Sequence, residues 1–199
     1  MKKTILILSI SLLFSFTNYS IAQTGLIAQK GMVVSAREEA SKIGVEIMKK
    51  GGNAFDAMVA TELALAVAYP YAGNIGGGGF MVFRKANGEV GSVDYREKAP
   101  LAATKDMFLD KNKNVIKGKS TETPLAIGVP GTIAGVFAVH KKYGSLPMAE
   151  IMKPVIALAE RGVVVTQKQE KRLNDYRDLI IKANGLKTKF ATVYKQNDT

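Results

Sequence analysis

Four consecutive residues, Asp94-Tyr95-Arg96-Glu97, combine both charge signs at the predicted end of a strand, just before Ala99-Pro100. An arginine at such a position presents a planar fork that can hold a carboxylate through two parallel hydrogen bonds. Strand ends beside glycine-rich loops are places where sheet proteins present side chains to ligands. From the residues alone, however, such a segment forms an ordinary surface or structural ion pair more often than it binds a ligand.

Two other motifs suggest catalysis, but their surroundings disfavour it. The run Gly76–Gly79 lacks the Gly-Lys-Ser/Thr that opens a helix in phosphate-binding loops, and it leads into a strand instead. We interpret it as a structural element that allows close backbone approach, rather than as a direct substrate contact. His140 lies beside two lysines near a predicted helix end, with no nucleophile motif such as GxSxG, so we interpret it as a surface residue.

The composition excludes several classes of site. The chain has 199 residues, 47% of them hydrophobic, with no cysteine and one histidine. Disulfides, thiolate nucleophiles and cysteine or multi-histidine metal sites are therefore excluded, and we predict no metal and no cofactor. The net charge is +11, but the lysines are scattered. This distribution indicates a solvated surface rather than a nucleic-acid interface.

Residues 1–22 are typical of a signal peptide. Two lysines precede the apolar run Thr4–Phe16, and Ser20-Ile21-Ala22 supplies small residues for cleavage before Gln23. An uncleaved membrane anchor is the alternative, but the apolar run is shorter than the roughly 20 residues that span a bilayer. We expect an exported protein, periplasmic or secreted, without a membrane span once the signal is removed.

The first half of the remaining chain predicts one strand and two helices. Apolar and β-branched residues favour a strand at Ile27–Ala36. Ser35 is a candidate N-cap for a helix that Gly51-Gly52 ends, and Asn53 is a candidate N-cap for the next. That second helix, Ala54–Tyr69, is apolar on nearly all sides, which is typical of a buried helix. Its interior polar residues are Asp56, Thr61 and Glu62.

The second half predicts a hairpin and three helices. Phe80–Phe83 and Glu89–Tyr95 read as strands, and Asn87-Gly88 is typical of a two-residue type I′ turn. Helices layered on a hairpin-containing sheet indicate an α+β fold. The three helices are expected at Thr132–Lys142, at Pro147–Arg161, and from a Thr166 cap to about Ala183.

Five sequence blocks, taken in chain order, together resemble those of the γ-glutamyltransferase family (γ-glutamyltranspeptidase, glutathione hydrolase). Each block is weak evidence alone, but five in order and spacing are specific. The resemblance runs from about Gly25 to the last residues. The blocks are Gly51–Ala57, Gly73–Met81, Asp94–Pro100, Val129–Thr132 and Lys142–Gly144.

The resemblance implies an N-terminal nucleophile hydrolase with an αββα sandwich, incomplete in this chain. In such enzymes an inactive precursor cleaves itself into a large and a small subunit and frees an N-terminal threonine. That threonine attacks the γ-glutamyl amide of glutathione, and the group passes to water or to an amino acid or peptide. Residues 23–199 correspond to the N-terminal portion of the large subunit, whose partner is the small subunit of the same precursor.

One functional residue carries over from the family. Arg96 matches the arginine that holds the α-carboxylate of the γ-glutamyl group. No threonine in this chain matches the processing site, so we assign no catalytic residue here and expect the chain alone to be inactive. The nucleophile and the oxyanion donors are expected on the small subunit.

Two alternatives remain open. In the first alternative, the protein is a different member of the same superfamily, either an acylase or a poly-γ-glutamate-processing enzyme. In the second, the chain is not an enzyme but a basic module that binds acidic polymers at the cell envelope. The salt dependence of binding distinguishes the enzyme from the binding module, because polyanion binding weakens steeply with added salt.

Overall fold

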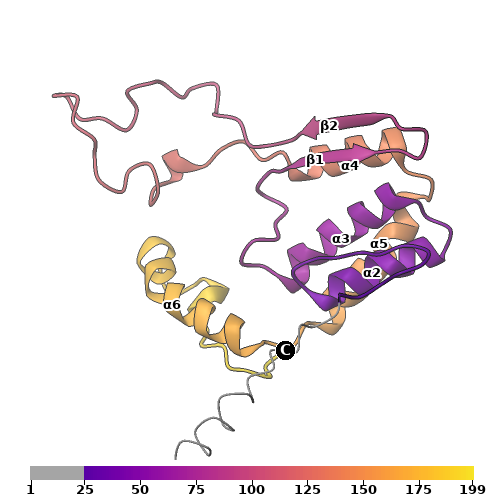
Figure 1. The fold of residues 1–199 in the computed structure, drawn as a ribbon. Helices are drawn as coiled ribbons and strands as arrows, with labels where there is room; N and C mark the ends of the chain where they lie inside the picture. Colours follow the sequence, from indigo (N-terminus) through magenta and orange to yellow (C-terminus); the bar gives the residue numbers. More distant parts are fainter. Residues whose placement is uncertain (1–24) are drawn as a thin grey trace, which may run out of the picture. The chain divides into compact units, whose positions relative to one another are not determined.

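The computed structural model describes residues 25–199, apart from the side chain of Phe190 (Figure 1). The predicted signal peptide, residues 1–22, lies outside the described residues. Residues 33–199 form one unit, and residues 25–32, which contain neither helix nor strand, belong to another. No helix in residues 25–199 is long and apolar enough to cross a membrane.

The predicted strand at Ile27–Ala36 is wrong. Residues 27–36 contain neither helix nor strand. Leu26 and Ile27 are 85% and 90% exposed, so these apolar side chains are not covered by a sheet. Strand propensity expresses how well a side chain packs on a paired, half-buried sheet, and no described strand pairs with this segment.

Helix α2 spans Glu38–Lys49, with two glutamates in its first turn and Lys49 in its last, which complements the helix dipole. Its N-cap is Arg37, so the predicted cap at Ser35 is wrong. The Ser35 hydroxyl instead donates to the Arg37 carbonyl at 2.8 Å, before the helix begins. The predicted end is confirmed, because Gly51 follows the helix with a φ of +94°.

Helix α3, Ala54–Ala68, is the buried helix that the sequence predicts. Asn53 caps it as expected, since its side chain accepts from the backbone N–H groups of Phe55 and Asp56. Asp56 completes the capping box by accepting from the Asn53 N–H at 2.9 Å. The helix packs against α2, α4 and α5 (Figure 1).

The three predicted C-terminal helices are confirmed. Gly162 and Gly185 follow the last two with φ values of +80° and +74°, and Thr166 caps the final helix in a capping box with Gln169. Short 3-10 turns occur at Pro124–Ala126 and Lys189–Ala191. The helices are α4 (Thr132–Tyr143), α5 (Met148–Arg161) and α6 (Gln167–Asn184).

Helices α2 to α5 enclose the hydrophobic core. The side chains at its centre come from one face each of α2, α4 and α5, and from several sides of α3. The core residues are Ala40, Ile43, Ile47, Val59, Ala60, Leu63, Ala64, Ala68, Val136, Val139, Ile151, Val155 and Leu158.

The start of α3 is bonded to the α4–α5 connection. The fully buried Asp56 carboxylate accepts from the Ser145 N–H at 3.0 Å and from its hydroxyl at 2.5 Å. Asn53 Nδ2 donates to the Tyr143 carbonyl at 2.7 Å. His140 is half-buried rather than a surface residue, and its Nε2 bonds the Leu146 carbonyl at 2.8 Å within the same connection. The histidine thus has a structural partner.

A single antiparallel hairpin forms the sheet of the described residues. Strand β1, Phe80–Arg84, pairs with β2, Val90–Asp94. The predicted two-residue type I′ turn is wrong, because Lys85 N–H donates to the Glu89 carbonyl and leaves a three-residue loop. Of these three residues only Gly88 takes a positive φ, +87°, whereas a type I′ turn needs two.

The fold class α+β is confirmed for residues 25–199, which are mostly helical with one two-stranded sheet. Helix α4 lies along the hairpin (Figure 1) and contacts β2. The ring of Phe83 on β1 packs 5.4 Å from Phe55 on α3 and 5.0 Å from Tyr143 on α4, measured between centroids. These contacts fix the hairpin on the helical core.

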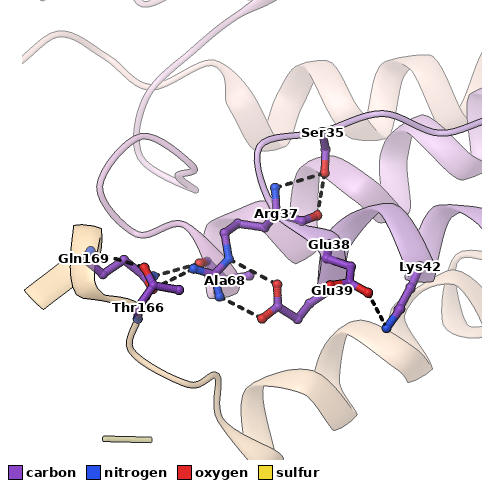
Figure 2. A network of polar contacts seen from close by, with 8 residues as sticks. All are labelled: Ser35, Arg37, Glu38, Glu39, Lys42, Ala68, Thr166 and Gln169. Carbon is purple, nitrogen blue, oxygen red and sulfur yellow. Dashed lines mark hydrogen bonds and ion pairs between the residues drawn. The ribbon is translucent and has the colours of Figure 1, made fainter. Parts of the chain in front are cut away.

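Polar contacts join the start of α6 to the start of α2 and to the end of α3 (Figure 2). Arg37 donates to the Gln169 side-chain oxygen at 2.6 Å and forms a two-bond ion pair with Glu39. Gln169 Nε2 donates onward to the Ala68 carbonyl at 3.2 Å. The Arg172 guanidinium also stacks 3.5 Å above the ring of Tyr71.

Candidate functional site

Arg96 lies just beyond the paired part of the hairpin. The backbone N–H of Tyr95 donates to the Gly79 carbonyl at 2.9 Å, and the Gly79 N–H donates back at 3.4 Å, so pairing continues one residue past β2. On the other side, Lys98 and Val129 exchange two backbone bonds of 3.2 and 2.7 Å. Arg96 and the residue after it are therefore held between two backbone pairings.

The Arg96 side chain is exposed and makes no ion pair with any residue in 25–199. Its own N–H donates to a carboxylate oxygen of Asp94 at 3.0 Å, which fixes the backbone and leaves the guanidinium unengaged. An unpaired guanidinium is a ready bidentate partner for a carboxylate. It borders an open groove of about 340 Å³ that is also lined by Lys98, Pro130, Ala134 and Ala138.

Two glycines allow the backbone around Arg96 to approach closely. A β-carbon at Gly78 would lie 2.7 Å from the Cα of Arg96, and one at Gly131 would lie 2.0 Å from the Tyr95 carbonyl oxygen. Neither distance is tolerable, because both contacts are with backbone. The glycines of the two predicted motifs thus meet around the arginine segment, although the motifs are far apart in the sequence.

The glycine run also binds the start of α4. The Gly77 carbonyl accepts from the N–H groups of Gly131 and Thr132 at 2.8 and 3.0 Å. Asn74 Oδ1 accepts from the Gly77 N–H and from the Thr132 hydroxyl, both at 2.7 Å. The predicted structural use of the run is confirmed.

Glu62 was not predicted to belong to the site. Tyr95 points inward and its hydroxyl donates to Glu62 Oε2 on α3 at 2.9 Å. Burial raises the pKa of the Glu62 carboxyl, and the bond from Tyr95 opposes that rise. Burial, together with the Glu62 charge, also raises the pKa of the Tyr95 hydroxyl. The sequence signal was a glutamate inside an otherwise apolar helix, but nothing in the sequence indicated its partner.

A larger groove than the one beside Arg96 lies elsewhere in the described residues. Its volume is about 770 Å³, and it runs between the start of α2, residues 69–71 and α6, without Arg96 in its wall. Residues 25–199 hold no group of three or more histidine, aspartate or glutamate side chains placed to bind a metal ion.

A sequence model of the γ-glutamyltranspeptidase family matches residues 40–199, which is most of the chain. The chain belongs to this family. The resemblance inferred from the five blocks is thereby confirmed, and the matched range contains Arg96, Tyr95, Glu62 and the glycine run.

Known relatives agree with this assignment. The chain is 53% identical over 152 residues to the glutathione hydrolase proenzyme of Pseudomonas sp. (strain A14), covering 76% of this chain and 26% of the relative. It is 46% identical over 149 residues to the corresponding Escherichia coli (strain K12) proenzyme, covering 75% and 26%. The chain thus spans about a quarter of these relatives.

The fold agrees as well. The crystal structure of Helicobacter pylori γ-glutamyltranspeptidase matches with a TM-score of 0.82 and 45% identity, over 87% of this chain and 51% of that one. The described residues therefore have the fold of part of a γ-glutamyltranspeptidase. The role of Arg96 in this family member stays a prediction, as does the αββα sandwich.

Proposed function

We propose that this chain is the N-terminal part of an exported γ-glutamyl hydrolase and transferase in which Arg96 binds the α-carboxylate of the substrate's γ-glutamyl group. The observation that carries the proposal is the exposed Arg96 guanidinium, unpaired within residues 25–199, on a backbone fixed at both sides. Family membership supplies the reaction class, and the predicted signal peptide supports export to the periplasm or the medium.

The mechanism assigns this chain a binding role. The Arg96 fork holds the α-carboxylate of glutathione through two charge-assisted hydrogen bonds, which orients the γ-amide. A threonine at the N-terminus of the small subunit, outside this chain, attacks the γ-carbonyl and forms an ester while the amine departs with a proton. Water, or the amine of an amino acid or peptide, then cleaves the ester and regenerates the hydroxyl.

The test is a pair of variants, Arg96→Lys and Arg96→Ala, in the complete precursor that carries this chain. Lysine keeps the charge but loses the fork, so it forfeits one charge-assisted bond of about 1.5–3 kcal/mol. The KM for a γ-glutamyl substrate is expected to rise roughly ten- to a hundredfold, at about 1.4 kcal/mol per factor of ten. Alanine raises it further.

The matched control is Arg84→Lys, because Arg84 is exposed at the opposite end of the same hairpin. It is expected to leave KM unchanged. Self-cleavage should survive in both Arg96 variants, since the precursor presents a peptide bond rather than a free α-carboxylate. An unchanged KM, or a precursor that no longer matures, would show that Arg96 is a structural residue.

A second experiment tests where the nucleophile lies. The mature 23–199 chain alone is expected to release no product from a chromogenic γ-glutamyl anilide above the rate of a heat-inactivated sample. The complete precursor, after self-cleavage, should turn the same substrate over. Turnover by the chain alone would contradict the placement of the catalytic threonine in the small subunit.

A further inference from the structure

The contact between Glu62 and Tyr95 joins the helical core to the segment that carries Arg96. Glu62 lies in the middle of α3, and its carboxylate accepts the Tyr95 hydroxyl at 2.9 Å. Within residues 25–199 this is the one hydrogen bond that the Glu62 side chain makes. The two residues are 33 positions apart, so only the tertiary fold brings them together.

The aromatic ring of Tyr95 lies against two glycines from separate segments of the chain. A β-carbon at Gly135 on α4 would lie 2.2 Å from Cγ of the ring, and one at Gly79 would lie 2.8 Å from Cε2. The ring therefore occupies the space that side chains would otherwise fill on both neighbours. With its hydroxyl bonded to Glu62 as well, Tyr95 is held along its ring and at its tip.

Arg96 depends on that anchorage for its position. Its guanidinium contacts no described partner that would orient it, and Arg96 is exposed directly beside the half-buried Tyr95. The inward fixation of Tyr95 therefore determines the outward direction of Arg96. We propose that Tyr95 and Glu62 are positioning residues that aim Arg96 at the substrate α-carboxylate, a role that rests on the proposed function of Arg96.

The protonation state suits this role. Burial raises the pKa of the Tyr95 hydroxyl above its ordinary value near 10. The hydroxyl therefore remains a hydrogen-bond donor throughout the neutral range. An uncharged acceptor at position 62 would receive the same bond, because a glutamine side chain also carries an oxygen acceptor.

The experiment uses four variants of the complete precursor: Tyr95→Phe, Glu62→Leu, Glu62→Gln and the control Tyr176→Phe. Tyr95→Phe keeps the ring and removes the donor, and Glu62→Leu removes the acceptor. Glu62→Gln preserves the acceptor. Tyr176 lies on α6 and is 47% exposed, so its variant loses a phenol hydroxyl away from Arg96. Each protein is assayed with a γ-glutamyl anilide and with a 4-aminobutyryl anilide, which lacks the α-carboxylate.

The expected result is a loss specific to the α-carboxylate. Tyr95→Phe and Glu62→Leu raise the KM for the γ-glutamyl substrate about tenfold, since a small misplacement of a binding group costs one to two orders of magnitude. Their kcat and their KM for the analogue stay within about twofold, as expected when only substrate binding is weakened. Glu62→Gln and Tyr176→Phe behave like the unchanged enzyme.

Three outcomes overturn the inference. If Arg96→Lys raises KM but Tyr95→Phe does not, the positioning role fails while the proposed function stands. If Tyr95→Phe and Glu62→Leu weaken both substrates equally, or act only by lowering the melting temperature, the contact is merely structural. If neither Arg96→Lys nor Tyr95→Phe changes KM, the proposed function itself fails, and the inference fails with it.

Discussion

Helix α3 carries two carboxylates that meet different surroundings. Asp56 is fully buried and accepts from the Asn53 N–H and from both the N–H and the hydroxyl of Ser145. Glu62 is half-buried and accepts one hydrogen bond, from Tyr95. The first carboxylate joins the start of α3 to the α4–α5 connection, whereas the second joins the core to the segment that carries Arg96.

This difference suggests that Asp56 serves the stability of the fold, whereas Glu62 serves substrate binding. A buried carboxylate is tolerated when protein donors replace its water, and Asp56 has such a set of donors. Glu62 receives a hydrogen bond from one donor and has some access to solvent. Removing its side chain therefore leaves fewer hydrogen-bonding groups without a partner. Changes at Asp56 should therefore act on folding, and changes around Glu62 and Arg96 should act mainly on binding.

The largest expected effect is that of Asp56→Ala. The change removes a fully buried carboxylate and leaves two N–H donors and the Ser145 hydroxyl without their charged acceptor, and such bonds contribute about 1.5–3 kcal/mol each. We expect a loss of about 3 kcal/mol or more in the free energy of unfolding, measured by denaturant titration of the mature enzyme. Asp175→Ala, which removes an exposed ion pair with Lys171, serves as control and should change it by at most about 0.5 kcal/mol. Unchanged stability in Asp56→Ala would refute the structural role.

A smaller effect is expected from Gly78→Ala. The new methyl group would collide with the backbone of Arg96, so we expect a destabilisation of about 1–3 kcal/mol together with a raised KM. Gly76→Ala is the matched control in the same run, because a β-carbon there meets no atom within 4 Å. Its melting temperature should equal that of the unchanged protein. Equal behaviour of the two variants would show that the run does not shape the Arg96 segment.

The smallest effect concerns the pH dependence of Glu62→Gln. Burial raises the pKa of Glu62, so the folded state binds a proton more tightly than the unfolded state does. Stability is therefore lost as the pH rises through that pKa, and glutamine removes this loss. We expect the variant to gain up to about 1 kcal/mol relative to the unchanged protein between pH 4 and pH 7.5, reduced by solvent screening. Melting curves at both pH values test the sign, and a relative gain toward low pH would contradict it.

The helices were predictable because their signals are local. Asn53 three residues before Asp56 specifies a capping box, and the glycines after α2, α5 and α6 provide helix ends with positive φ. The two errors in the strands arose where strand pairing decides the structure. The segment Ile27–Ala36 has strand propensity but no described partner strand, and the Lys85–Glu89 pair selected a three-residue loop over a two-residue turn.

The family, the order of the helices and the presence of an arginine at a strand end could all be inferred from the residues alone. Which residues surround that arginine became evident in the folded chain. Gly78, Gly131 and Glu62 come from separate segments, and their proximity to Tyr95 and Arg96 results from packing α3 and α4 against the hairpin. Local signals follow from a few neighbouring residues, whereas a contact between residues 33 positions apart depends on how the whole core folds.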